Sequence, residues 1–225
     1  MTCQIASINN MLKLTSLTYI NALIARHQPL LPLKDSIISA CEAISNSHNN
    51  GRKVLVCGNG GSAADAEHIV GELMKEFLFR RDMPESDIEL FRDSGIEDWE
   101  HFTNTLQPAI RAIALTQHPA LSSAMVNDRD PYMVFAQQVY GYGKKGDILL
   151  AISTSGTAKN VINAIKTAKV LGLVNIGLTG GKPSPMDSLC DILIKAPETQ
   201  TYRIQELHQP IYHCICMVVE EELFG

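Results

Sequence analysis

The sequence contains two short turns whose residue types suit the binding of a phosphate group. The first is Gly58-Asn59-Gly60-Gly61-Ser62, and the second is Ser153-Thr154-Ser155-Gly156-Thr157. Each turn follows a short apolar run and opens a helical stretch, where bare backbone amides and nearby hydroxyl groups suit an anionic oxygen group. The pair predicts one phosphorylated ligand bound from two loops. The alternatives are a tight turn without a ligand and, for the second turn, hydroxyl groups that only cap a helix.

Candidate acid–base and metal-binding side chains lie on two predicted helices. His68 and Glu72 are four residues apart, so they share one face of the helix after the first turn. The last helix, about residues 203–223, carries Gln205 and His213 on one broad face. A histidine and a carboxylate can bind a metal ion or transfer protons, and a solvated pair is the alternative. The chemistry requires these two helices to face each other.

The apolar pattern predicts an α/β fold in which strands and helices alternate. Two amphipathic helices occupy the first fifty residues, where Ile5, Ile8 and Met11 begin the first helical pattern. Short, continuous apolar runs, typical of strands covered on both faces, follow at 53–57, 110–115, 147–152, 173–178 and 191–195. Helical stretches lie at 62–78, 131–141, 157–171, 184–188 and in the last helix, within which Pro210 removes one backbone hydrogen bond. This alternation predicts a parallel sheet with helices on both faces and ligands at the carboxyl ends of its strands.

Residues 80–106 interrupt this alternation. They are rich in Asp, Glu and Arg and contain Pro84, Gly95 and the chain's one tryptophan, Trp99. A surface excursion with a short helix of its own is one interpretation. A lid over the ligand is the other, since long insertions in compact domains often serve function.

Composition favours one domain of 225 residues and disfavours several classes of protein. Neither turn has the Gly-Lys-Ser/Thr of a P-loop or the glycine spacing of a dinucleotide-binding loop. A net charge of −5 argues against a nucleic-acid partner. We find no secretory signal and no apolar run near the ~18 residues of a membrane span. The six cysteines form no CxxC pair, so we expect free thiols in a cytoplasmic protein.

Three motifs in this order give the chain a family resemblance. They are the first turn with His68 and Glu72, the segment Ile152-Ser153-Thr154-Ser155-Gly156, and the segment Arg203-Ile204-Gln205-Glu206-Leu207-His208 with His213. Over about residues 35–222 the chain resembles the SIS-domain sugar isomerases and, within them, the phosphoheptose isomerases. Asn127-Asp128 resembles a further motif near the sugar. The resemblance implies a three-layer αβα sandwich with a five-stranded parallel sheet, assembled as a homotetramer with active sites at subunit interfaces.

The resemblance also implies the reaction and the residue roles. The family converts sedoheptulose 7-phosphate into D-glycero-D-manno-heptose 7-phosphate. By position, Ser62, Ser153, Thr154, Ser155 and Thr157 would hold the phosphate. Glu72 would be the general base and His213 the general acid. The positions at which family members bind zinc are His68, Glu72, Gln205 and His213. We expect Asn59, Gly60, Gly61, Asn127, Asp128 and Gln205 to contact substrate as well.

The chemistry of the residues agrees with such a reaction. Moving a carbonyl from C2 to C1 transfers a proton between neighbouring carbons through an enediol, for which a carboxylate and an imidazole suffice. A carboxylate that is bound to zinc is a weaker base, so the metal and base roles of Glu72 oppose each other, although zinc could polarise the carbonyl.

Two alternatives stay open: a phosphosugar-binding SIS protein without catalysis, and an isomerase of another ketose phosphate. Two departures from the family bear on the second. Tyr202 stands where many members have Asp, and the stretch from Glu76 to about Pro108 is longer than usual.

Overall fold

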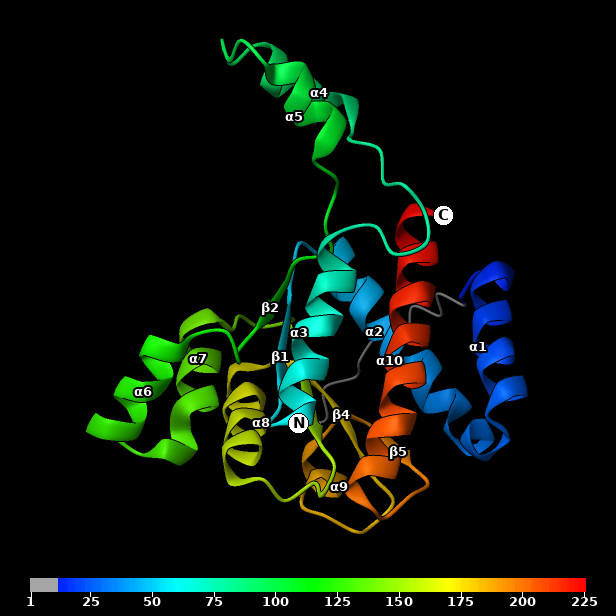
Figure 1. The fold of residues 1–225 in the computed structure, drawn as a ribbon, viewed down its shortest axis with the longest axis vertical. Helices are drawn as coiled ribbons and strands as arrows, with labels where there is room; N and C mark the ends of the chain where they lie inside the picture. Colours follow the sequence, from blue (N-terminus) through cyan, green and yellow to red (C-terminus); the bar gives the residue numbers. More distant parts are fainter. Residues whose placement is uncertain (1–11) are drawn as a thin grey trace, which may run out of the picture.

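The computed structural model describes residues 12–225 and contains a five-stranded parallel sheet (Figure 1). The strands are β1 (Val54–Cys57), β2 (Ala112–Ala114), β3 (Ile148–Ser153), β4 (Val174–Gly180) and β5 (Ile192–Ala196). Their order in the sheet is β2-β1-β3-β4-β5. All five lie within two residues of the runs expected from the sequence, so the predicted parallel sheet is confirmed.

Two hydrophobic cores cover the two faces of the sheet. On one face, alternate strand residues such as Val54 and Val56 pack against α2 (Lys34–Asn49), α3 (Gly61–Met74) and α10 (Thr201–Phe224). On the other face, Leu55 and Cys57 pack against α7 (Val134–Tyr142) and α8 (Lys159–Leu171). Side chains alternate across a strand, so two covered faces require continuous apolar runs. The predicted αβα sandwich is confirmed.

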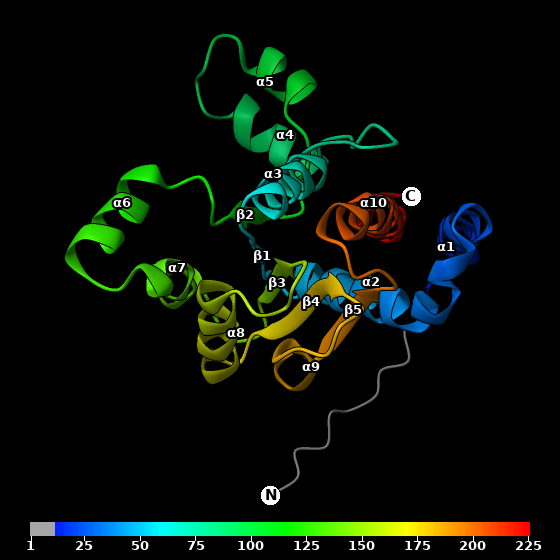
Figure 2. The ribbon, with the colours of Figure 1, turned by 60° about the horizontal axis from the view of Figure 1, so that its bottom comes forward.

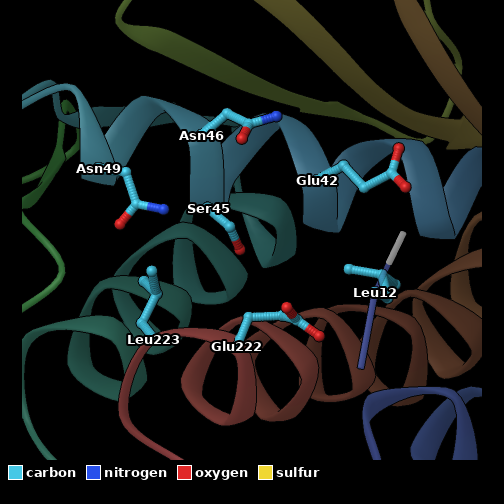
Figure 3. Close-up of a pocket in the computed structure, with 7 residues that line it drawn as sticks. All are labelled: Leu12, Glu42, Ser45, Asn46, Asn49, Glu222 and Leu223. Carbon is cyan, nitrogen blue, oxygen red and sulfur yellow. The ribbon is translucent and has the colours of Figure 1, made fainter. Parts of the chain in front are cut away.

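The N-terminal helices pack against the last helix. α1 (Leu14–Arg26) lies beside α10, and a 3-10 helix (Gln28–Leu33) joins it to α2. The expected helical positions 5, 8 and 11 lie outside the described residues. A small cavity of about 40 Å³ lies near the C-terminal end of α10, and Figure 3 shows the residues that line it. Glu42 and Glu222 line it, and burial and the charge of Glu222 raise the pKa of Glu42. From α1, Ser16 Oγ donates a hydrogen bond to Glu222 Oε1.

Several helix boundaries differ from those expected. α3 ends at Met74 rather than near residue 78, because the amides of Phe77 and Leu78 donate to the Glu220 carboxylate instead of continuing the helix. α10 runs without a break through Pro210. Residues 131–133 form a 3-10 helix ahead of α7, and α9 (Met186–Leu189) is one turn long.

Three helices go beyond the elements expected from the sequence, which predicted one short helix in the excursion. They are α4 (Glu85–Arg92) and α5 (Trp99–Thr105), both inside the excursion, and α6 (Pro119–Asp128). None of the three contains a buried residue, so none packs into either hydrophobic core. The α4–α5 hairpin leaves from the C-terminal end of α3 and projects from the body (Figure 1). Within one chain it therefore lies at the end of α3 opposite the first Gly/Ser turn.

Two further expectations concern the described residues only. No helix from Leu12 onward has both the length and the apolar character needed to cross a bilayer. The five cysteines after Cys3 are free thiols, and four of them are buried.

Candidate active site

The two Gly/Ser/Thr turns lie side by side at one edge of the sheet. β1 and β3 are neighbours, with Cys57 paired to Ala151, so the residues that follow both strands emerge together. The strand order also reverses here, because the chain runs from β1 outward to β2 and then returns to β3 on the other side. Open parallel sheets bind ligands at this switch point. The predicted convergence of the two turns is present in the fold.

The first turn leaves the N-terminal end of α3 without a side-chain cap. Gly60 has φ +56° and ψ −122°, a conformation that favours glycine, and no side chain caps the helix. A side chain at Gly58 would collide with the backbone of Ser62, so the turn is tight. Asn59 exchanges two hydrogen bonds of 2.9 Å with Asn160 at the start of α8, which joins the two turns. Asn59 therefore fixes the loops relative to each other.

The hydroxyl groups of the second turn do not cap α8. The N-cap residue is Ala158, which has no capping side chain, and the side chain that accepts from an amide of the first turn is Asn160, whose Oδ1 accepts from Val161 N at 3.0 Å. Ser155 Oγ instead accepts from Thr157 N and Thr157 Oγ1, at 3.2 Å and 2.9 Å. Ser155 and Thr157 are exposed, whereas Ser153 is buried. The interpretation as simple capping is therefore wrong.

Helices α3 and α10 face each other and bring four polar side chains together. His68 Nε2 lies 3.0 Å from Glu72 Oε1, and His213 Nε2 lies 3.5 Å from His68 Nε2. The Tyr212 hydroxyl lies 3.0 Å from His68 Nδ1. We call His68, Glu72, Tyr212 and His213 the His–Glu cluster. Sequence reasoning missed Tyr212; its position next to His213, on a helix required to face α3, was the available signal.

The charge states of this cluster suit proton transfer. Burial and the neighbouring His68 lower the pKa of His213 below 6.5, and Glu72 partly opposes this shift. The His213 imidazole is therefore neutral at neutral pH. Burial and the carboxylate of Asp65 raise the pKa of Tyr212, so its hydroxyl keeps its proton. Glu72 Oε2 is buried and has no hydrogen-bond partner within residues 12–225. Lys75 Nζ lies 3.7 Å from the same oxygen, which can still accept a proton from a substrate.

The residues expected to bind zinc come together only in part. Gln205 fills the space that a side chain at Gly61 would need, so it lies at the N-terminal end of α3. It is eight residues before His213, which corresponds to about 12 Å along α10. Among the described residues, no three His, Cys, Asp or Glu side chains are arranged to hold a metal ion. The donor types suit zinc, but within one chain they do not form a complete site.

Asn127 and Asp128 do not reach the cluster within one chain. They lie at the C-terminal end of α6, just ahead of the 3-10 helix and α7, and Asn127 Nδ2 donates to Asp128 Oδ1 at 2.7 Å. α6 contacts α7 and the 3-10 helix before it. Figures 1 and 2 both show α6 on the side of the molecule away from α10. Their predicted role near the sugar stays a prediction.

Comparison with known proteins agrees with this geometry. The sequence matches the SIS domain family over residues 18–100 and 100–180, two segments that meet inside the α4–α5 hairpin. Phosphoheptose isomerase 2 of Campylobacter jejuni is 41% identical over 189 residues, which cover 84% of this chain and 81% of that protein.

Two solved structures are also similar. The phosphoheptose isomerase of Francisella tularensis is 30% identical with a TM-score of 0.72, covering 92% of this chain and 97% of that one. The phosphoheptose isomerase of Neisseria gonorrhoeae is 28% identical with a TM-score of 0.70 and the same coverage. The fold, the paired turns and these relatives together show that the chain belongs to the SIS domain family and, within it, to the phosphoheptose isomerases.

Proposed function

We propose that the protein interconverts sedoheptulose 7-phosphate and D-glycero-D-manno-heptose 7-phosphate through an enediol. The observation that carries the proposal is the His–Glu cluster, in which a carboxylate and an imidazole from two helices meet beside the same His68 ring. Its relatives are named phosphoheptose isomerases, which supports the same reaction type for this chain.

The arrangement along α3 suits a sugar phosphate that lies lengthwise on the helix. The phosphate would bind the α3 amides, Ser62 and the second turn, with Gln205 beside it. From Ser62 to His68 the helix rises about 9 Å. This is comparable to the length of an extended sugar chain, so C1 and C2 would lie at the His–Glu cluster while the phosphate occupies the turns.

Glu72 would transfer the carbon-bound proton, and His213 would transfer the oxygen-bound proton. Glu72 Oε2 removes the proton from C1 of the ketose and returns it to C2, because a carboxylate can accept and release a proton at one position. Neutral His213 moves the proton between the two oxygens of the enediol. His68 Nε2 donates to Glu72 Oε1, so Oε2 is the carboxylate oxygen that remains for proton transfer.

The direct test is to incubate the purified protein with sedoheptulose 7-phosphate and measure formation of the aldose phosphate. Fructose 6-phosphate serves as the comparison substrate. Turnover of the heptulose phosphate supports the proposal. Binding without turnover of either sugar would support the alternative, a phosphosugar-binding protein. Turnover of the hexose phosphate alone would point to another ketose phosphate as substrate.

A serine substitution tests the phosphate half of the site. We expect Ser155→Ala to raise KM about tenfold to a hundredfold with kcat within about twofold, since it removes one hydrogen bond to a charged group. Ser94→Ala, an exposed serine in the α4–α5 hairpin, is the matched control and should leave KM unchanged. An unchanged KM in Ser155→Ala would remove the second turn from the phosphate site.

Zinc is a further part of the proposal. We propose that it binds between His68 and His213, with Glu72 as a third ligand after releasing its hydrogen bond from His68; Gln205, the fourth expected ligand, lies about 12 Å from His213 along α10. The 3.5 Å between the two Nε2 atoms supports this, because two ligands of a tetrahedral zinc lie about 3.3 Å apart. Bound zinc would polarise the substrate carbonyl. Metal analysis should find about one zinc per chain in the wild type and none in His68→Ala; a metal-free wild type with full activity would contradict this.

Assembly as a homotetramer is also proposed. Its support is that Asn127 and Asp128 remain outside the site within one chain and that the hairpin exposes large apolar side chains such as Leu90 and Phe102. Light scattering from the purified protein measures the state directly; a monomer that turns over substrate would contradict it.

A further inference from the structure

A buried ion pair joins the base of the α4–α5 hairpin to the last helix. Arg81 and Glu220 have side chains that are 0% and 1% exposed, and the Arg81 Nη2 and Glu220 Oε1 atoms are 2.8 Å apart. Arg81 follows Arg80, which pairs with Asp82 at the surface, with a side chain that is 70% exposed. Burying two charges costs desolvation free energy, which only good geometry and further hydrogen bonds can offset. The contacts of this pair therefore identify the backbone segments that it fixes.

The contacts of Arg81 lead to the backbone of Glu72. Its Nη2 donates to the Glu72 carbonyl at 3.3 Å, and its Nη1 donates to the Leu73 carbonyl at 2.9 Å and the Pro108 carbonyl at 3.4 Å. The carbonyls of Glu72 and Leu73 belong to the last turn of α3, where helical carbonyls lack an intrahelical partner. Arg81 thus caps the end of the helix that presents the Glu72 carboxylate. The guanidinium is also stacked over Phe224, 4.7 Å from the ring centroid.

The contacts of Glu220 lead to His213. The carboxylate accepts from Phe77 N at 2.8 Å and from Leu78 N at 2.7 Å, which fixes the chain just after α3. The Phe77 ring packs against the His213 ring, with 5.6 Å between centroids. Glu220 lies two turns after His213 on the same helix. The ion pair is therefore connected to both proton-transferring residues: Arg81 bonds to the backbone of Glu72, and Glu220 fixes the backbone of Phe77, whose ring contacts His213.

We propose that Arg81 and Glu220 are positioning residues for catalysis: they fix the backbone of Glu72 and the ring of Phe77 so that Glu72 and His213 keep their separation. Neither residue contacts the ligand in this arrangement. The proposal rests on the proposed function of Glu72 and His213. It predicts a loss in the proton-transfer step with little effect on binding of the phosphate, because the two turns lie at the opposite end of α3.

Two conservative variants test the proposal with the full-length protein. Glu220→Gln keeps the shape but removes the charge, and Arg81→Lys keeps the charge but cannot reach all four oxygen acceptors. We expect kcat to fall at least about tenfold in each, with KM for sedoheptulose 7-phosphate within about twofold, since small displacements of reacting groups are costly. Amide hydrogen exchange should rise in residues 72–78 and not in the second turn. Arg80→Ala is the matched control and should behave as wild type.

The outcomes separate this proposal from the proposed function. If Glu72→Gln retains activity, the role of Glu72 is wrong. If Glu72→Gln is inactive while folded Glu220→Gln and Arg81→Lys retain wild-type kcat, the positioning role alone is wrong. Equal losses in KM and kcat would indicate general destabilisation and would also overturn it. Should Glu220→Gln fail to fold, Phe224→Leu takes its place, because it removes only the ring beneath Arg81; a folded Phe224→Leu must then show reduced kcat at unchanged KM.

Discussion

Glu72→Gln is expected to lower kcat for sedoheptulose 7-phosphate by about a thousandfold while KM changes little. An amide has nearly the shape of a carboxylate and still accepts a hydrogen bond from His68 through its oxygen, but it cannot take a proton from carbon. General acid–base groups contribute about 10²- to 10⁴-fold to rate, and the loss should lie within this range. The buried Oε2 atom of Glu72 has no hydrogen-bond partner among the described residues and lies 3.7 Å from Lys75 Nζ; it is the atom whose chemistry is removed.

The matched control for this variant is Glu67→Gln on the same helix. Glu67 is exposed, and its Oε1 accepts from Thr116 Oγ1 at 3.0 Å, away from the His–Glu cluster. It loses the same charge from α3, so a general effect of charge on substrate binding would appear in both variants. Equal kcat values in Glu72→Gln and Glu67→Gln would contradict the assignment of Glu72 as base.

His213→Gln is expected to lower kcat by about a hundredfold, again with a small change in KM. The glutamine amide can hydrogen-bond to a substrate oxygen but cannot move a proton between the two oxygens of the enediol. In the wild type, kcat should fall as pH drops through the lowered pKa of His213, below 6.5, since the imidazolium cannot accept a proton. This acid limb should be absent from the residual activity of His213→Gln.

The comparison variant is His101→Gln in the α4–α5 hairpin, where the side chain is exposed. It should show wild-type kcat and the same acid limb as the wild type. A His213→Gln variant that keeps the wild-type pH profile would show that another group carries the limb, and the role of His213 would then be wrong.

The sheet and the turns could be predicted because their signals are local. Short apolar runs that end in Gly58 and Ser153 specify both a buried strand and the loop after it. The pairing of His68 with His213 is different, since 145 residues separate them. Their positions on helix faces restricted the possibilities, and only the packing of α3 on α10 brought the two rings together.

Features that depend on distant partners could not be predicted. Arg81 stands in a charge-rich segment and looked like a surface residue, because its partner Glu220 is 139 residues away. The same carboxylate ends α3 early by accepting from Phe77 and Leu78. The helices of the excursion and α6 contain no buried residue, so their packing against the body gives no signal in the sequence. Thr157 Oγ1 donates to Ser155 Oγ, and neither side chain caps α8. The N-cap position falls on Ala158, and the sequence does not specify this helix boundary to the residue.

The most direct test of the account is the fate of the carbon-bound hydrogen during turnover in D₂O. The account predicts that the wild type forms aldose phosphate with deuterium at C2, because the proton held by Glu72 exchanges with water before it returns. The His68 side chain beside Glu72 is 41% exposed, so the cluster borders on solvent. Glu72→Gln should incorporate none above the uncatalysed background. A wild-type product that retains its original hydrogen, or incorporation by Glu72→Gln at the wild-type rate, would contradict proton transfer by Glu72.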